Sequence, residues 1–183
     1  MANSPTIKTA RLAMVPFSDL HISARYVGWL NDPETMALSR QRLASHTIQS
    51  CRDYVASFLN SPNYLWAIER HDEQNEPGEH IGNIRANIDT DNNTADVAIL
   101  IGERSSWGTG IGSEAWIGVC NWLLSDGGIR KVYAGTTSIN KGMLGIMRKS
   151  DMVDDGIRRR HYEIDGQEVD VIYTALFKDS KST

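Results

Sequence analysis

The sequence predicts a mixed α/β (α+β) fold in which a mixed sheet is covered by helices. Short stretches of the chain alternate apolar and polar residues, as strands do, and longer stretches carry apolar residues at helical spacing. The expected order is one strand, two helices, three strands, a helix, a strand, a helix and two strands. That order is typical of a sheet packed against helices.

The composition indicates a single domain. The 183 residues are 40% hydrophobic, which is enough for a core, so we expect residues 1–183 to fold as one unit. A net charge of −4 provides no basic field for nucleic acid. We find no signal peptide and no stretch long enough to span a bilayer, and Cys51 and Cys120 indicate no disulfide framework. We therefore expect a cytoplasmic protein without nucleic-acid or membrane partners.

The first half of the chain contains clear start signals for helices. Ser18 and Thr47 are N-cap residues placed directly before apolar residues at helical spacing. The segment 31–46 contains a helix-breaking Asn-Asp-Pro and is otherwise polar. The predicted elements are a strand over 8–15, a helix over 19–30 and a helix over 48–59.

The second half alternates strand and helix patterns more regularly. Gly127 and Gly128 end one helix, and Asp165-Gly166 predicts the two-residue turn of a final hairpin over 160–178. The other predicted elements are strands over 64–70, 80–89, 94–103 and 131–137, and helices over 113–125 and 140–149.

Three glycines lie between the strand over 94–103 and the helix that follows. Gly108, Gly110 and Gly112 let the backbone approach a ligand closely and turn several N–H groups toward one point. The helix adds the positive end of its dipole, which favours an anion such as a phosphate. A plain tight turn is the alternative. The spacing matches neither the dinucleotide fingerprint nor the phosphate loop of nucleotide hydrolases.

Two stretches together carry a family resemblance. "WGTGIGSEAW" after an apolar strand, and "NKGMLGIMRKSDMVDDGIRRRHY" after a later one, resemble the GCN5-related N-acetyltransferase (GNAT) superfamily. The similarity is greatest to the branch of ribosomal-protein N-terminal and amino-sugar N-acetyltransferases. It implies a mostly antiparallel central sheet of about seven strands with helices on both faces. It also implies acetyl-CoA as cosubstrate, a small-molecule amine as acceptor and no metal.

The resemblance also implies a coenzyme site. Leu100, Ile101 and Gly102 would supply backbone partners for the pantetheine arm, and Asn140 a polar contact or an ordinary helix N-cap. Trp107 stands where the family has Gln or Arg, but backbone N–H groups hold the pyrophosphate, so the change is compatible with binding. The implied pyrophosphate loop and its flank are Trp107, Gly108, Thr109, Gly110, Ile111, Gly112 and Ser113.

The family's usual proton-transfer groups are missing. Some members have a glutamate and a tyrosine where this chain has Gly135 and Met147, and neither of these can exchange a proton. Either other groups serve, or the enzyme mainly aligns a neutral amine with the thioester.

Several side chains could replace the missing groups. Asp96 shares a strand face with Ala98 and Leu100, although it could instead pair with Arg85 on a neighbouring strand. The other candidate catalytic residues are His46, Tyr162, His80 and His161.

The segment 38–47 suggests the acceptor. Arg40, Arg42 and His46 are donors suited to a phosphorylated or hydroxyl-rich molecule, whereas the alternative is a solvated connector. We expect an amino sugar or a nucleotide-linked amino sugar. The alternatives are a protein N-terminus or lysine, and a module that binds coenzyme A without catalysis. A homodimer is possible.

Overall fold

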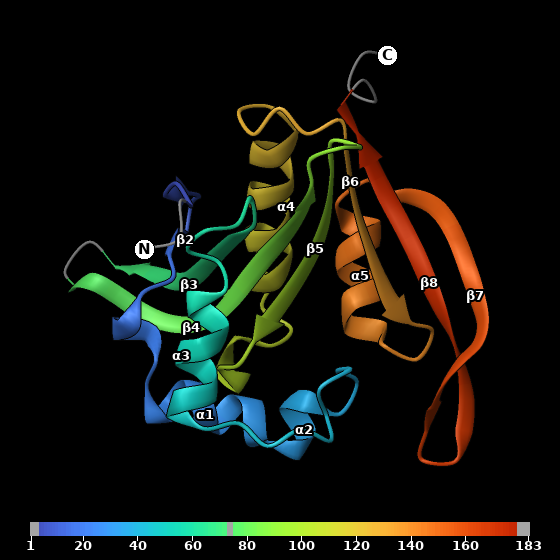
Figure 1. Ribbon diagram of the computed structural model, residues 1–183, viewed down its shortest axis with the longest axis horizontal. Helices are drawn as coiled ribbons and strands as arrows, with labels where there is room; N and C mark the ends of the chain where they lie inside the picture. The colour runs from blue at the N-terminus through green and yellow to red at the C-terminus, as the bar shows by residue number, and fades with distance from the viewer. Residues whose placement is uncertain (1–3, 73–74, 179–183) are drawn as a thin grey trace.

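The computed structural model describes residues 4–72 and 75–178, whose strands form one eight-stranded sheet in the order β1-β2-β3-β4-β5-β6-β8-β7 (Figure 1). The strands are β1 (Ile7–Lys8), β2 (Leu12–Pro16), β3 (Tyr64–Asp72), β4 (Asn75–Asp89), β5 (Thr94–Ile101), β6 (Lys131–Thr137), β7 (Val153–Ile164) and β8 (Gln167–Phe177). The helices are η1 (Asp19–His21), α1 (Ala24–Asn31), α2 (Pro33–Met36), α3 (Ile48–Ala56), η2 (Arg104–Ser106), α4 (Ile111–Leu124) and α5 (Lys141–Lys149), where η marks a 3-10 turn.

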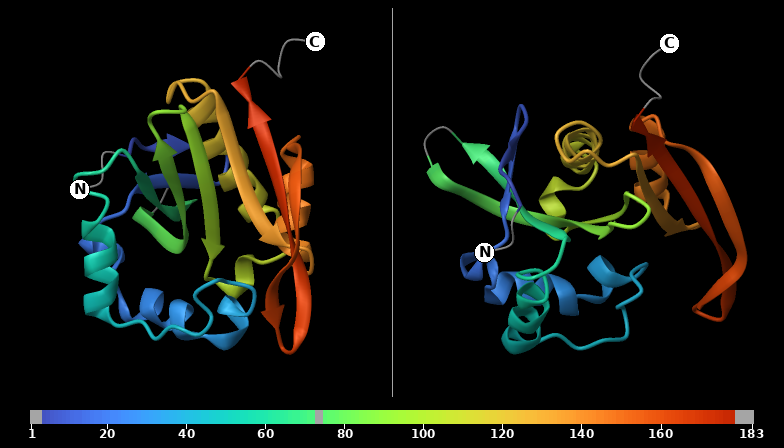
Figure 2. Two further views of the ribbon diagram at one scale, coloured as in Figure 1. Left: turned by 45° about the vertical axis from the view of Figure 1, so that its right-hand side comes forward. Right: turned by 45° about the horizontal axis from the view of Figure 1, so that its top comes forward.

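Helices cover both faces of the sheet, with α4 and α5 on one face and α1, α2 and α3 on the other (Figure 2). This arrangement confirms the predicted α+β class. The sheet has one strand more than expected because the predicted strand over 8–15 is interrupted. The Thr9 N–H donates to the Leu12 carbonyl at 2.9 Å, so a tight turn separates β1 from β2.

The predicted helix over 19–30 is also divided in two. Ser18 is the N-cap of only the 3-10 turn η1, where its N–H donates to the Nδ1 atom of His21 at 2.9 Å. Ser23 then caps α1 by accepting from the Tyr26 N–H at 3.2 Å. Farther on, Asp32 caps the unpredicted helix α2, whereas Thr47 caps α3 as predicted.

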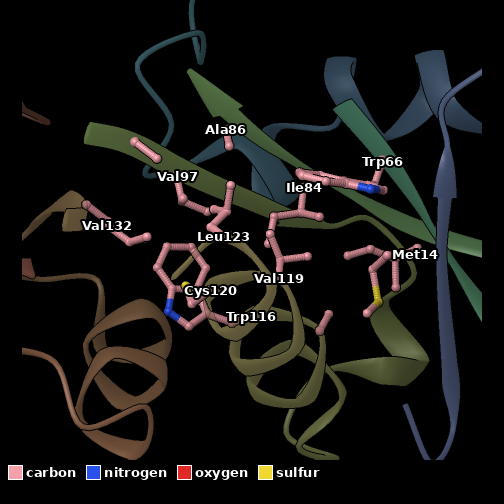
Figure 3. Close-up of a cluster of buried hydrophobic side chains, with 14 of the residues drawn as sticks. Met14, Trp66, Ile84, Ala86, Val97, Trp116, Val119, Cys120, Leu123 and Val132 are labelled. Carbon is pink, nitrogen blue, oxygen red and sulfur yellow. The ribbon is translucent and has the colours of Figure 1, made fainter. Parts of the chain in front are cut away.

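Each face of the sheet has its own hydrophobic core. On one face, Trp116, Val119 and Leu123 of α4 pack against strand residues such as Ile84 and Val97 (Figure 3). The other core is formed by Phe17, Tyr26, Trp29, Cys51, Val55, Phe58, Leu65 and Ala67. Each large apolar side chain that is fully buried contributes about 1.5–3 kcal/mol, so these clusters hold the helices on the sheet.

Strands β5 and β6 form the one parallel pair among the described strands, and they pair only over a short length. The paired residues run from Thr94 with Lys131 to Asp96 with Tyr133. Beyond that point the two strands diverge (Figure 1). The edge of β5 that faces β6 is therefore open after Asp96.

The final hairpin turns at Asp165-Gly166, as predicted, with φ angles of +51° and +74°. Its first strand, β7, begins at Val153 rather than near Arg160. Most of β7 is exposed on both faces, so its sequence carries no apolar alternation from which the strand could have been predicted.

Candidate active site

The glycine loop leads directly into α4, as the sequence predicts. Gly108 and Gly110 have φ angles of +75° and +85°, a region that glycine adopts without steric cost. Gly110 is the N-cap of α4 and has no side chain with which to cap the helix. The first N–H groups of α4 therefore have no side-chain cap from Gly110, and they lie at the positive end of a 14-residue helix, where an anion is favoured.

Trp107 fastens this loop to the end of β5. Its indole Nε1 donates to the Ile101 carbonyl at 2.8 Å, and the ring stays partly exposed. The Arg104 guanidinium lies 5.9 Å from the ring centroid. The residue that replaces the family's Gln or Arg thus makes a contact through its side chain and leaves the backbone of the loop unobstructed.

The backbone of β5 alternates between its two neighbours. Gly102 donates its N–H to Ile81, and the Leu100 carbonyl lies against Gly82 of β4. Because successive residues of a strand turn their polar groups to opposite edges, Val97, Ile99 and Ile101 face the open edge. Of the three residues expected to contact pantetheine, only Ile101 faces that edge, and its carbonyl already accepts from Trp107.

A cavity of about 1010 Å³ lies on the sheet face that carries α1, α2 and α3. It brings together Leu100, Asn140, Arg40, Arg42, His46, Asp96 and Tyr162 from the predicted site residues. Ile101, Gly102 and the loop from Trp107 to Ser113 do not line it. The predicted coenzyme loop and the predicted acceptor residues therefore lie in two separate regions, joined by β5.

Comparison with known proteins assigns the family. A model of the acetyltransferase (GNAT) domain matches residues 11–153, which is most of the chain. The chain belongs to the GNAT acetyltransferase family. It is therefore an acetyl-CoA-dependent N-acetyltransferase. The comparison with curated proteins found no match.

Solved structures of other GNAT proteins share the fold at low sequence identity. The ribosomal L7/L12 α-N-protein acetyltransferase RimL, solved with coenzyme A, has a TM-score of 0.81 and 16% identity, over 94% of this chain and 98% of RimL. The spermidine N-acetyltransferase of Vibrio cholerae, solved with CoA and spermine, has a TM-score of 0.80 and 12% identity, over 93% and 97% of the two chains. The microcin C7 self-immunity acetyltransferase MccE, solved with acetyl-CoA and AMP, has a TM-score of 0.74 and 14% identity, over 96% and 98%.

In this GNAT protein, Asp96 lies where β5 and β6 separate. Among the residues that the structure describes, Asp96 is the one carboxylate that lines the cavity. Its Oδ2 lies 3.8 Å from Nη2 of Arg85, so the pairing considered from the sequence is present. Burial raises the pKa of Asp96, while Arg85 and, more weakly, Arg40 act to lower it.

His46 is held in place through its backbone. The side chain of Asn31 accepts from the His46 N–H and donates to the His46 carbonyl, both at 2.8 Å. The Nε2 atom of His46 is buried without a hydrogen-bond partner. His80, another candidate, does not line the cavity: it packs against Trp29, and burial lowers its pKa to about 3.

Tyr162 lines the cavity directly after a bulge in β7. Arg158 pairs with Val171 and Tyr162 with Val169, so three residues of β7 lie opposite Asp170 alone. Asp170 stabilises the bulge by accepting hydrogen bonds from the Arg159 side chain at 2.7 Å and the Arg160 N–H at 2.9 Å. His161 lies within the bulge and is exposed, outside the cavity.

The positions of the family's glutamate and tyrosine are filled differently here. Gly135 lines the cavity, and the ring of Tyr173 lies against it, so that a Cβ atom at Gly135 would come within 2.6 Å of that ring. Met147 is 1% exposed and belongs to the hydrophobic core. The structure thus gives neither position a titratable group.

Four arginines line the cavity: Arg40, Arg42, Arg85 and Arg158. Sequence reasoning missed Arg158 and considered Arg85 only as a partner of Asp96. Alternation along β4 could have shown that Asn83 and Arg85 share a face opposite the buried Ile84. No pattern in the sequence indicated the bulge that precedes Tyr162.

Within residues 4–72 and 75–178, no helix is long and apolar enough to cross a membrane.

Proposed function

We propose that this GNAT enzyme acetylates the amino group of a small acceptor, namely an amino sugar that carries a phosphate or a nucleotide-linked amino sugar. The observation that carries the proposal is the charge of the cavity: four arginines and one carboxylate line it. Such a cavity attracts phosphate or other anionic groups and disfavours a polycation such as a polyamine. Its volume, about 1010 Å³, suits a molecule as large as a sugar nucleotide.

The walls of the cavity also favour a small acceptor. The Arg42 Nη2 donates to the Glu163 carbonyl at 2.8 Å, which joins the segment between α2 and α3 to the β7–β8 hairpin. Because this contact bridges two walls of the cavity, it narrows the path along which an extended peptide would have to lie. Arg40 is the stronger candidate for an acceptor phosphate, because the Arg42 guanidinium already donates to the Glu163 carbonyl.

The coenzyme, in this proposal, binds along the other region. N–H groups at Gly110, Ile111, Gly112 and Ser113 receive its diphosphate, and glycines leave room for that approach. The pantetheine arm lies on the open edge of β5 from Ile101 toward Val97, a span of roughly 13 Å at about 3.3 Å per residue. Asn140, whose side chain caps α5 by accepting from the Met143 N–H, faces the cavity beside this path.

This placement brings the thioester next to Asp96, and we assign Asp96 the role of proton acceptor. The carboxylate takes a proton from the acceptor ammonium, and the neutral amine attacks the acetyl carbon. The N–C bond forms and the C–S bond breaks, and the second proton that the nitrogen loses replaces the one given to the departing thiolate. The Tyr162 phenol, in the same cavity, is the candidate proton donor to the departing thiolate. A carboxylate whose pKa is raised by burial is a better base near neutral pH than an ordinary aspartate.

The experiment is a thiol-release assay with acetyl-CoA and a panel of amines, with the products identified by mass spectrometry. The panel contains a phosphorylated amino sugar, a nucleotide-linked amino sugar, spermidine and a peptide with a free N-terminus. We expect the two anionic sugars to be acetylated with the highest kcat/KM. Preference for the peptide or spermidine would overturn the acceptor assignment, and no turnover with any amine would indicate a module that only binds the coenzyme.

The role of Asp96 is tested with the preferred acceptor. We expect Asp96→Asn to lower kcat strongly and to abolish the acid limb of the pH–rate profile, whose midpoint in the wild type lies above the usual aspartate pKa. Binding of acetyl-CoA, measured by calorimetry, serves as the control and stays unchanged. An Asp96→Asn enzyme that keeps the acid limb excludes this role.

A further inference from the structure

Arg85 and Asp96 form an ion pair that has no short hydrogen bond between its two side chains. Their closest charged atoms are 3.8 Å apart, beyond the 2.7–2.9 Å of a charge-assisted hydrogen bond. Other ion pairs of the protein close to short distances, such as Arg11 with Glu114 at 2.6 Å. Arg85 also has a buried Nη1 without a hydrogen-bond partner. Hydrogen-bonding capacity is therefore unused on Arg85, and its ion pair with Asp96 lines the cavity without a short hydrogen bond.

The strand register fixes where these unused groups lie. Arg85 lies opposite Ala98, and Asp96 is the next residue along β5 on the same face. The small side chain of Ala98 leaves space over the sheet beside the pair. Asn83, the next residue of β4 on that face, has a buried Oδ1 that also lacks a partner. The floor of the cavity thus carries a row of polar groups that starts at the point where β5 and β6 separate.

We propose that Arg85 is a specificity-determining residue that selects acceptors with an oxygen atom on the carbon next to the amine. This inference rests on the proposed function, in which Asp96 receives the amine proton. An amine held by Asp96 places a neighbouring hydroxyl or other oxygen within reach of the Arg85 guanidinium. A 2-amino-2-deoxy sugar has this arrangement, whereas spermidine has no oxygen to offer.

The energetic reason is the cost of an unpaired charged donor. An acceptor with the neighbouring oxygen pairs the Arg85 Nη2, which lies 3.8 Å from the Asp96 carboxylate, whereas one without it leaves that N–H desolvated when the cavity fills. A hydrogen bond to a charged group corresponds to about a tenfold to hundredfold preference.

The test compares two isomeric acceptors, trans-2-aminocyclohexanol and trans-4-aminocyclohexanol, which differ only in the position of the hydroxyl. With saturating acetyl-CoA, we expect the wild type to acetylate the 2-isomer with a kcat/KM at least about tenfold higher. The two amines also differ in basicity, and this difference affects both enzymes equally. In Arg85→Gln, the ratio of the two kcat/KM values should therefore fall close to the ratio set by the reactivities of the amines alone. Arg85→Lys, which keeps the charge and one donor, should restore part of the preference.

Arg52→Gln is the matched control, since Arg52 is an exposed arginine of α3 that does not line the cavity, and it should keep the wild-type ratio. Equal rates for the two isomers in the wild type, turnover of neither isomer, or an unchanged preference in Arg85→Gln would overturn the inference. Turnover confined to amines without a neighbouring oxygen would overturn it as well, while leaving an active N-acetyltransferase. The absence of turnover with every amine tested would overturn the N-acetyltransferase activity itself, and a preference for spermidine or a peptide would overturn the proposed acceptor.

Discussion

Arg11 holds Glu114 by an ion pair of 2.6 Å between its Nε and the Oε2 atom, and thereby joins the turn between β1 and β2 to the first turn of α4. The same carboxylate accepts from the Arg11 N–H at 2.8 Å and from the Thr9 hydroxyl at 2.6 Å. Arg11 also donates to the Thr109 carbonyl, inside the glycine loop. The glycine loop is therefore held in place by the turn between β1 and β2, which is distant in sequence.

Loss of the Arg11 contacts with Glu114 and Thr109 should weaken coenzyme binding and lower the stability of the protein in a pH-dependent way. Burial tends to raise the pKa of Glu114, but the hydrogen bonds from Thr9 and Arg11 outweigh it and lower the pKa below the usual glutamate value. A lowered pKa in the folded state contributes stability above the unfolded pKa, and that contribution is lost as the pH falls through the folded pKa.

We expect Arg11→Gln to reduce the free energy of unfolding by about 1 kcal/mol or less at neutral pH, since Arg11 is half exposed. The difference from the wild type should shrink in acid, and the Kd for acetyl-CoA should rise. Denaturant unfolding at several pH values, with calorimetry at neutral pH, checks both expectations. A stability difference that grows as the pH falls would contradict the account.

The two arginines predicted to bind the acceptor should behave differently. Arg40 acts on the Asp96 charge, and its removal takes away one influence that lowers the pKa of Asp96. Arg40→Gln should therefore raise the acceptor KM about tenfold or more and move the acid limb of the pH–rate profile to higher pH. Arg42→Gln removes the contact with the Glu163 carbonyl and should change acceptor kinetics less. Acceptor kinetics measured at fixed ionic strength test this difference between Arg40 and Arg42. Equal effects of the two variants on the acceptor KM and on the acid limb would refute it.

A side chain at position 135 should not be tolerated while Tyr173 is present. A Cβ atom there would approach the Tyr173 ring at 2.6 Å, and the Arg158 guanidinium stacks over that ring at 5.0 Å. We expect Gly135→Ala to lower the melting temperature and the acceptor kcat/KM, and Tyr173→Ala to relieve the clash in the double variant. Thermal melts of the three variants test this, and a Gly135→Ala protein as stable and active as the wild type would show that the ring moves freely.

Met147 should act through packing alone. Its side chain lies in the core below α5, so Met147→Ala should cost about 2–5 kcal/mol in the free energy of unfolding. Because the thioether does not titrate, the limbs of the pH–rate profile should keep their midpoints in the folded variant. Denaturant unfolding and the pH–rate profile test this, and the disappearance of one limb would show that Met147 positions a titrating group and does not act through packing alone.

The parts of the structure that could be predicted from the sequence depend on neighbouring residues. The glycine loop, the N-cap at Thr47 and the Asp165-Gly166 turn are local patterns, and all three appear as expected. The breaks after Lys8 and at Ile22 were missed because distant or unusual partners cause them. Glu114 binds the turn between β1 and β2 from more than 100 residues away, and the His21 ring accepts from the Ser18 N–H at the start of a short 3-10 turn.

The cavity shows the same division. Residues on one strand face, such as Asp96 and Leu100, were placed together correctly because a strand alternates. The separation of β5 from β6 after Asp96 has no local pattern in the sequence, and Tyr173 comes from a strand that offered no sign of facing Gly135. Arg158 and Tyr162 flank a bulge that Asp170 stabilises, a tertiary feature without a local pattern.

The most direct test of the coenzyme site is a calorimetric titration of acetyl-CoA into the wild type, Gly110→Asp and Gly110→Asn. Both variants place a side chain of nearly equal size at a φ of +85°, so they share the backbone strain, and only Asp adds a negative charge beside the diphosphate. We predict tight binding by the wild type, weaker binding by Gly110→Asn and loss of measurable binding by a folded Gly110→Asp. Equal affinities of the two variants, with both proteins folded, would contradict the assignment of the loop to the diphosphate.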